Sequence, residues 1–244
     1  MARIALVTGG MGGIGTAICQ RLAKAGYTVV TTYSRPGREQ QWLADQQEQG
    51  YAFHAYQCDV ADFDACQAMA EQVRRDVGEV DILVNNAGIT KDTTFRKMSK
   101  LDWDLVLRTD LDSVFNVTKP FVELMMDRNF GRIINISSIN GQKGQFGQTN
   151  YSAAKAGMHG FTKSLAQEVA KKGVTVNTIS PGYIATEMVM AVKEEVRHAI
   201  IAGIPVGRLG SPEEVAELVV FLASENAGFI TGANIAINGG QHMC

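Results

Sequence analysis

The chain has few of the features that mark secreted, membrane-spanning or metal-binding proteins. No uninterrupted apolar run is long enough to cross a bilayer. The sequence passes from Met1 directly into an apolar segment, so no signal peptide is expected. The cysteine spacing indicates reduced thiols of a cytoplasmic protein rather than a metal site, and there are only 4 of them: Cys19, Cys58, Cys66 and Cys244. We therefore expect neither a membrane partner nor a disulfide.

Linkers, repeats and a strong charge of one sign are missing too. The sequence has no Pro/Ser-rich stretch, charge block or internal repeat, and its net charge of -2 argues against a nucleic-acid partner. The histidines show no metal-ligand spacing, so no metal is expected: His54, His159, His198 and His242. With 45% hydrophobic residues, the 244-residue chain can bury a sizeable core, and we expect residues 1–244 to form a single domain.

The sequence does contain a regular alternation of strand and helix signals. Short apolar segments predict strands at 3–8, 29–33, 52–57, 81–85, 132–137, 174–180 and 233–237. Helices are expected at 16–25, 38–49, 151–170 and 212–224, with Pro212 in the first turn of the last, and 101–126 is expected to be one long or bent helix. Another helix is expected after Asp62 as N-cap, because the apolar residues from 66 to 77 fall at helical spacing. Repeated strand–helix units predict an α/β fold, a doubly wound parallel sheet with helices on both faces. Ligands of such folds bind beyond the carboxyl ends of the strands.

A glycine-rich turn follows the first predicted strand. It fits two registers, Gly10-x-Gly12-x-x-Gly15 and Thr8-Gly9-x-x-x-Gly13-x-Gly15. Glycines let the backbone approach a pyrophosphate, and the helix that follows supplies amide donors at its N-terminus. The turn thus predicts a dinucleotide site in a Rossmann-type fold, although a plain tight turn could use the same glycines. The expected contacts are Gly9, Gly12, Gly13, Ile14 and Gly15.

The end of the second predicted strand indicates which dinucleotide binds. Dinucleotide folds that prefer NAD usually place an acid there for the ribose hydroxyls, but residues 32–38 contain none. An arginine pairs with a 2′-phosphate as a bidentate donor. We therefore predict NADPH/NADP, with Arg35 as the leading contact and Ser34 and Arg38 as secondary ones. The alternative is that both arginines are solvated loop charges.

Tyr151 and Lys155 lie four residues apart in a predicted helix and so share a face, and Ser138 precedes Tyr151 by 13 residues. A phenol ordinarily loses its proton near pH ~10, but a nearby cation and a hydrogen-bonding hydroxyl favour its ionised form. The three groups could exchange a proton with an alcohol or ketone oxygen near neutral pH. The Tyr-x-x-x-Lys spacing is common on helices, so a surface pair is the alternative.

Four motifs together resemble the short-chain dehydrogenase/reductase family, over nearly the whole chain. They are the Thr8-Gly9 register of the glycine turn, Asn85-Asn86-Ala87-Gly88, the Ser138, Tyr151 and Lys155 set, and Pro181-Gly182. The resemblance implies that Tyr151 donates a proton to a carbonyl oxygen, that Ser138 holds this oxygen, and that Lys155 also contacts the nicotinamide ribose. The cofactor residues it further implies are Asp59 and Val60 at the adenine, Asn86, Ala87 and Gly88 at the ribose, and Pro181, Gly182 and Ile184 at the nicotinamide. Asp59 could instead be a strand-terminal cap.

One position departs from the family pattern. The family commonly has an asparagine in the helix before the fifth strand, where this chain has Asp110. In the family this residue holds a water beside the lysine, largely through its backbone carbonyl. An aspartate keeps that carbonyl but adds negative charge near Lys155, and we include Asp110 as a fourth catalytic residue.

The segment between Ser138 and Tyr151 bears on the substrate, because its position places it over the reacting carbon. It offers the amide donors Gln145 and Gln148 around Phe146, which favours a short polar acyl group. Asp92 and Tyr183 should also face this pocket.

This segment resembles the acetoacetyl-CoA reductases of polyhydroxyalkanoate synthesis, which implies acetoacetyl-CoA as substrate and (R)-3-hydroxybutyryl-CoA as product. One alternative is a 3-oxoacyl-acyl-carrier-protein reductase of fatty-acid synthesis, whose acidic partner could bind Arg128, Lys171 and Lys172. Another is a non-catalytic NADP-binding sensor, in which Asp110 would mark decay of the site.

Two further regions carry expectations of their own. Residues 188–204 follow the nicotinamide segment and are expected to form a mobile lid. The predicted helices 101–126 and 151–170 are long, and the second is rich in small residues that permit close approach. The family resemblance implies a homotetramer built on these two helices.

Overall fold

The computed structural model describes residues 2–243 and contains one sheet of seven parallel strands in the order β3-β2-β1-β4-β5-β6-β7. The strands are β1 (Ile4–Val7), β2 (Thr28–Tyr33), β3 (Phe53–Gln57), β4 (Val80–Asn85), β5 (Gly131–Ile136), β6 (Val174–Pro181) and β7 (Asn234–Ile237). The chain first winds outward from β1 to β3 and then returns to pair β4 on the other side of β1. The predicted fold class, a doubly wound parallel sheet, is confirmed.

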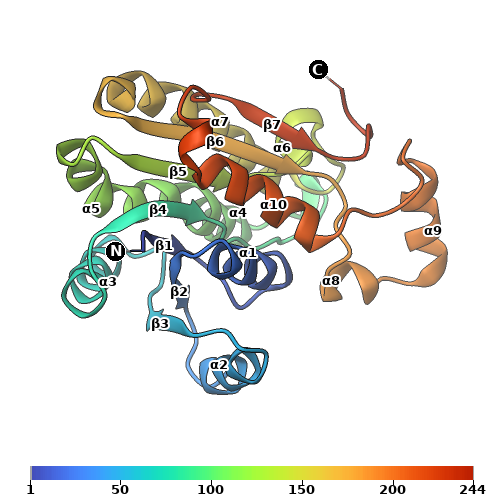
Figure 1. Cartoon of the computed structure of the whole chain (residues 1–244). Coiled ribbons are helices and arrows are strands. Elements are labelled where there is room, and N and C mark those ends of the chain that lie inside the picture. The colour runs from blue at the N-terminus through green and yellow to red at the C-terminus, as the bar shows by residue number, and fades with distance from the viewer. Residues whose placement is uncertain (1, 244) are drawn as a thin grey trace.

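Helices cover both faces of this sheet. They are α1 (Gly13–Lys24), α2 (Glu39–Glu48), α3 (Phe63–Asp76), α4 (Lys100–Leu107), α5 (Ser113–Asp127), α6 (Asn140–Lys143), α7 (Thr149–Val169), α8 (Glu187–Met190), α9 (Glu194–Ala202) and α10 (Pro212–Ala223). Short 3-10 turns are η1 (Phe95–Lys97), η3 (Ala170–Lys172) and η4 (Glu225–Ala227), and η2 (Arg108–Asp112) is a π turn. In Figure 1, α1 and α10 lie in front of the sheet, and α4, α5 and α7 lie behind it.

Side chains that alternate along each strand build two separate cores. Ala5 and Val7 of β1 belong to the core beneath α1 and α10, whereas Leu6 points to the core beneath α3, α5 and α7. All three side chains are fully buried. Because both faces of a parallel sheet are covered, a central strand such as β1 is continuously apolar rather than alternating, whereas the edge strand β3 also carries exposed residues.

Helix starts follow the capping signals of the sequence. The Asp62 carboxylate accepts a hydrogen bond from the Ala65 amide at 2.9 Å and caps α3 as predicted. Ser211 and Glu214 form a capping box before α10, with Pro212 at the first helical position. Such caps stabilise a helix by about 1 kcal/mol.

Several segments differ from the expectations: α1 begins at Gly13, before its predicted start at residue 16, and α6 was not predicted. The segment 101–126, expected as one long or bent helix, is divided by the π turn at 108–112 into α4 and α5. Helix α7 begins at Thr149, two residues before the predicted start. The predicted lid region is mostly helical, as α8 and α9, and in Figure 1 these helices stand to the right, away from the sheet.

No helix within residues 2–243 combines the length and apolar character needed to span a membrane. Cys19, Cys58 and Cys66 are free thiols, with the sulfurs of Cys58 and Cys66 3.8 Å apart. Cys244, expected as a terminal thiol, lies outside the described residues.

Gly10 is one of the glycines of the turn that the surrounding fold requires. A Cβ there would lie 2.1 Å from Thr31 Oγ1 and 2.7 Å from Cys19 Sγ. We expect Gly10→Ala to lower the free energy of unfolding by about 1–3 kcal/mol, as over-packing does, with Tm falling about 2–4 °C per kcal/mol. Thermal unfolding measures both quantities.

Gly12→Ala is the matched control. The nearest atom that a Cβ there would meet is the Gly9 carbonyl oxygen at 3.7 Å, an ordinary contact distance, and the φ of -87° at Gly12 suits any residue. The free energy of unfolding of this variant should stay within about 0.5 kcal/mol of the wild type. Equal losses in the two variants would contradict the steric explanation.

Candidate active site

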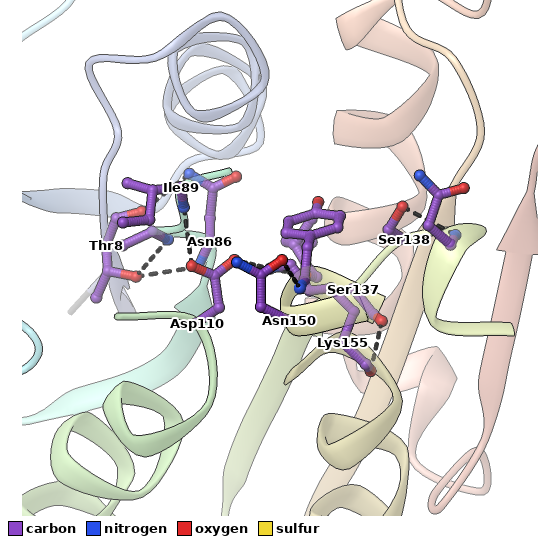
Figure 2. Close-up of polar contacts among 12 residues, drawn as sticks. Thr8, Asn86, Ile89, Asp110, Ser137, Ser138, Asn150 and Lys155 are labelled. Carbon is purple, nitrogen blue, oxygen red and sulfur yellow. Dashed lines mark hydrogen bonds and ion pairs between the residues drawn. The ribbon is translucent and has the colours of Figure 1, made fainter. Parts of the chain in front are cut away.

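The glycine turn and the segment after β4 are joined by a set of short hydrogen bonds at the carboxyl ends of β1 and β4. Thr8 Oγ1 accepts from the amides of Asn86 and Ala87, both at 3.0 Å. The Asn86 side chain donates to the carbonyl oxygens of Thr8 at 2.9 Å and Gly9 at 3.1 Å. Figure 2 shows Thr8 and Asn86 side by side. The structure thus brings the predicted pyrophosphate turn against the predicted ribose segment.

Close approach in this turn depends on glycine. Gly9 has a φ of +64°, and a Cβ at Gly15 would lie 2.4 Å from the Gly9 carbonyl oxygen. Gly12 and Gly13 are exposed beside Ile14, so the first turn of α1 presents uncovered backbone amides. This is the cradle that a dinucleotide pyrophosphate needs.

Thr186 is a further residue at this turn, and it was not expected from the sequence. A Cβ at Gly13 would lie 3.0 Å from Thr186 Cγ2, so Thr186 stands over the glycine turn. Its hydroxyl caps α8 by accepting from the Val189 amide at 3.5 Å. The Thr186-Glu187 pair before a short helix was a signal that could have identified it.

The predicted 2′-phosphate residues lie directly after β2. Ser34, Arg35 and Arg38 are all exposed. Within residues 2–243 neither arginine forms an ion pair with an acidic side chain, so both guanidinium groups are free to bind an anion. The charge and the exposure at this end of the sheet fit a phosphorylated ribose.

The predicted adenine residues follow β3. Asp59 is exposed and its carboxylate accepts a hydrogen bond from the Ala61 amide at 3.0 Å. That bond is the one expected of a strand-terminal cap, and the other carboxylate oxygen remains available. Val60 is buried, and its carbonyl oxygen accepts from the Asn116 side chain at 3.1 Å.

Lys155 is a buried cation held at three points. Its side chain is 4% exposed, its amine donates to the Ile136 carbonyl at 3.0 Å, and it lies 3.3 Å from the Asp110 carboxylate. The amine is also 5.5 Å from the centre of the Tyr151 ring. Tyr151 and Lys155 therefore lie on a common face of α7, as predicted, and Asp110 contacts Lys155 there.

Asp110 reaches this position because of the π turn. Its side chain is completely buried, and one carboxylate oxygen accepts from the Ile89 amide at 2.8 Å. Figure 2 shows Asp110 between the segment that carries Ile89 and the Lys155 side chain of α7. A Cβ at Gly88 would lie 2.7 Å from Asp110 Oδ2 and 3.2 Å from Lys155 Nζ, so only glycine lets this segment pass the pair.

Burial is the largest influence on the pKa of Asp110. Burial raises the pKa of Asp110, whereas the Lys155 charge and the Ile89 amide act in the opposite direction. The net shift of this pKa is upward, so removal of the carboxylate from water outweighs its favourable contacts. A buried aspartate beside the lysine is thus a second titratable group, which an asparagine would not provide.

Ser138 is the first of four hydrogen-bonded residues that lead to Asp92. Its hydroxyl oxygen accepts from the Asn140 amide at 3.1 Å, and Asn140 in turn contacts Gln148. Gln148 also donates to Asp92 at 2.7 Å. Asp92 and Gln148 were both expected to face the substrate, but their side chains are hydrogen-bonded to each other. Asn140 was not expected from the sequence, and no local pattern marks it.

The other predicted substrate residues are more accessible. Phe146 is 87% exposed between two glycines of positive φ, Gly144 and Gly147. Gln145 accepts a hydrogen bond from Lys143 at 3.0 Å, which leaves its amide hydrogens free.

The segment after β6 meets the Ser138 loop through its backbone. The Pro181 carbonyl oxygen accepts from the Ile139 amide at 2.8 Å. Gly182 packs so closely on Asn238 that a Cβ would lie 2.8 Å from its Cα. Tyr183 and Ile184 line a small cavity with Ile204 and Asn238. The predicted nicotinamide segment and Ser138 thus lie at one edge of the sheet.

The sequence was also compared with known proteins. The family model described as "Enoyl-(Acyl carrier protein) reductase" (adh_short_C2) matches residues 9–242. The acetoacetyl-CoA reductase of Cupriavidus necator is 60% identical over 242 residues, with 99% of this chain and 98% of the relative covered. The acetoacetyl-CoA reductase of Rhizobium meliloti is 58% identical over 244 residues, covering 100% of both chains. The 3-oxoacyl-[acyl-carrier-protein] reductase FabG of Haemophilus influenzae is 44% identical over 244 residues, covering 99% of this chain and 98% of the relative.

The family match spans the glycine turn, the segment after β4 and the Ser138 to Lys155 region that the structure brings to one edge of the sheet. The chain therefore belongs to the short-chain dehydrogenase/reductase family, whose members are oxidoreductases that use a nicotinamide cofactor.

Proposed function

We propose that the protein reduces acetoacetyl-CoA to (R)-3-hydroxybutyryl-CoA with NADPH, and so supplies the monomer for polyhydroxybutyrate synthesis. The observation that carries the proposal is the full-length similarity, at 60% identity, to a relative named acetoacetyl-CoA reductase. The structure supports the chemistry, because Tyr151 and Lys155 share a face next to the predicted cofactor segments.

The residues of the chain have separate tasks in this reaction. Tyr151 donates a proton to the carbonyl oxygen of the substrate, and Ser138 hydrogen-bonds that oxygen. The Lys155 charge stabilises the phenolate that Tyr151 leaves behind and binds the nicotinamide ribose. The bound cofactor supplies the hydride. We also propose that Gln145, Phe146 and Tyr183 contact the acyl group.

NADP rather than NAD is proposed as the cofactor. Arg35 and Arg38 are exposed cations without acidic partners in the described chain, and Ser34 adds a hydroxyl beside them. Asp59 and Val60 hold the adenine, and Asn86 to Gly88 hold the ribose next to Lys155. Pro181, Gly182 and Ile184 hold the nicotinamide near Ser138.

Asp110 is proposed to act through Lys155. The carboxylate anchors the lysine amine together with the Ile136 carbonyl, so the amine keeps its place before the cofactor ribose binds. The sensor alternative is less well supported. A non-catalytic protein would be expected to have lost catalytic residues, but this chain keeps all three: Ser138, Tyr151 and Lys155.

The carrier-protein substrate is the alternative. Arg128 offers little for an acidic partner, because it lies near Glu79 and Asp81 and donates to the Val80 carbonyl. Lys171 and Lys172 are exposed in η3. The 44% identity to the carrier-protein reductase is lower than the identity to the CoA reductases, which favours CoA.

A homotetramer in the cytoplasm is proposed for the assembly. Phe63 and Phe115 stack at 6.0 Å and are exposed at a hollow between α3 and α5, which supports self-association near α5. The free thiols Cys19, Cys58 and Cys66 suit a reducing compartment. Light scattering tests the assembly, and a monomer would overturn it.

The substrate is tested with the purified protein, NADPH, and either acetoacetyl-CoA or acetoacetyl-carrier protein. We expect the higher kcat/KM with acetoacetyl-CoA. Tyr151→Phe should lower kcat/KM by about 10²–10⁴, the usual contribution of a general acid. A large preference for the carrier-protein substrate would refute the proposal, and NADPH oxidation with neither thioester would support the sensor.

The phosphate contact is tested with Arg35→Ala. Loss of charged hydrogen bonds of about 1.5–3 kcal/mol should raise the KM for NADPH roughly 10- to 100-fold and leave the KM for NADH nearly unchanged. Arg75→Ala, which removes an exposed arginine of α3, serves as the control. An unchanged KM for NADPH in Arg35→Ala would show that the arginine is a solvated charge.

The aspartate is tested with Asp110→Asn. Because the pKa of Asp110 is raised in the fold, its contribution to stability is full below the unfolded value near ~3.9 and is lost as pH rises through the folded value. The Tm of Asp110→Asn minus the Tm of the wild type should therefore increase as the pH rises from about 4 towards neutrality. Thermal unfolding at a series of pH values measures this difference.

The same variant should change the pH–rate profile. Protonation of Asp110 removes the charge beside Lys155, so kcat/KM of the wild type should fall as the pH falls through the raised pKa of Asp110. The asparagine variant has no charge to lose at this position, so its kcat/KM should not show this decrease at low pH. Identical profiles and rates would leave Asp110 only its backbone role.

A further inference from the structure

A continuous row of hydrogen bonds links Asp92 to Ser138. The Gln148 side-chain amide donates to Asp92 Oδ2 at 2.7 Å, and Asn140 Nδ2 donates to Gln148 Oε1 at 2.8 Å. The backbone amide of Asn140 donates to Ser138 Oγ at 3.1 Å. We call these four residues the Asp92–Ser138 link.

The direction of this link is fixed by the carboxylate at its end. An ionised aspartate only accepts hydrogen bonds, so Gln148 must present its NH₂ group to Asp92. Its carbonyl oxygen then faces Asn140, which must in turn present its own NH₂ group. Each amide therefore has one possible orientation, and Gln148 uses both of its polar ends inside the protein.

The segment that carries Asp92 also holds the other end of the loop. The Thr93 amide donates to the Gly147 carbonyl oxygen at 2.9 Å. Asn150, which is fully buried, donates to the Lys91 carbonyl oxygen at 3.3 Å and accepts from the Tyr151 amide at 2.8 Å. Residues 91–93 are thus a common anchor for the loop that begins at Ser138 and ends at Tyr151.

Asn140 is the member of the link that contacts Ser138 directly. It is 9% exposed and begins the four-residue helix α6. Its backbone amide occupies an acceptor site of the Ser138 hydroxyl, which leaves the hydroxyl proton for a carbonyl oxygen of a substrate. A helix of one turn has little stability of its own, so contacts with other segments must hold it. The side-chain bond to Gln148 is one of them, beside the Ile139 bond to the Pro181 carbonyl oxygen and the close packing of Gly141 on Lys155.

We propose that Asn140 is a positioning residue for the reduction, which sets Ser138 through the link to Gln148 and Asp92. The inference rests on the proposed function and gives Gln148 a structural role in the link. Misplacement of Ser138 affects the transition state more than ground-state binding, so kcat should respond more than KM.

The first test removes the hydrogen-bond donor at position 140 and so breaks the link. Asn140→Asp keeps the shape of the side chain but offers only acceptors. Gln148 cannot donate to carboxylates at both of its ends, so kcat with acetoacetyl-CoA should fall about 10- to 100-fold.

A second exchange should restore the link. In the double variant Asp92→Asn/Asn140→Asp, the new amide at position 92 can donate to the Gln148 carbonyl oxygen, and Gln148 can donate to the new carboxylate at position 140. Its kcat should be at least about tenfold higher than that of Asn140→Asp alone. A distant exchange, Asn129→Asp, controls for added charge on the surface.

Several outcomes decide the proposal. Wild-type kcat in Asn140→Asp would overturn it, and so would a double variant no faster than Asn140→Asp when both unfold at the wild-type Tm. Gln148→Ala provides a second measurement if Asn140→Asp does not fold. A lower kcat with nearly the same KM supports the link, whereas a higher KM with the same kcat would show that Gln148 binds the substrate directly.

Failure of the inference is distinguishable from failure of the proposed function. If the wild type does not reduce acetoacetyl-CoA, the proposed function fails. The same variants can then be compared on whichever 3-oxoacyl thioester the wild type does reduce.

Discussion

The Lys155 ammonium group is buried, and a buried cation is tolerated only when other groups replace the water it has lost. Here the Ile136 carbonyl and the Asp110 carboxylate replace it. Much of the local structure follows from this requirement. The π turn brings Asp110 inward, the Ile89 amide holds the carboxylate, and Gly88 leaves room for the pair. The site is costly to form, since burial raises the pKa of Asp110, and costs of this kind are common where a protein does chemistry.

The parallel sheet explains why these groups meet. Carboxyl ends of neighbouring parallel strands lie at one edge, so the turns after β1, β4, β5 and β6 converge there although they are far apart in the sequence. Side chains then connect one turn to the next. Asn86 joins the turn after β4 to the glycine turn after β1. Residues 91–93 join it to the end of the loop before Tyr151, from which Gln148 and Asn140 connect to Ser138. The proposed cofactor and substrate segments are thereby held to each other rather than to the sheet alone.

The loop between Ser138 and Tyr151 divides into a fixed part and an accessible part. Gln148 and Asn150 are hydrogen-bonded to the turn after β4, and Asn140 is hydrogen-bonded to Gln148. Phe146, in contrast, is exposed between two glycines. A hydrogen-bonded frame around one accessible aromatic suits the proposed pocket, which has to hold Ser138 in place while an acyl group enters. The same division explains why the polar residues of this loop are a poor guide to substrate contacts, since a polar side chain can serve the frame instead.

Local patterns in the sequence determined the strands, most of the helices, the glycine turn and the common face of Tyr151 and Lys155, because apolar period, capping residues and helical spacing act between neighbours in the chain. The Asp62 cap and the start of α10 at Pro212 are of this kind. Only the tertiary structure decided that Asp110 pairs with Lys155, that Thr186 stands over Gly13, and that Gln148 is bonded to Asp92, 56 residues away. Such contacts depend on how distant turns meet at the edge of the sheet, and no spacing within one segment encodes them.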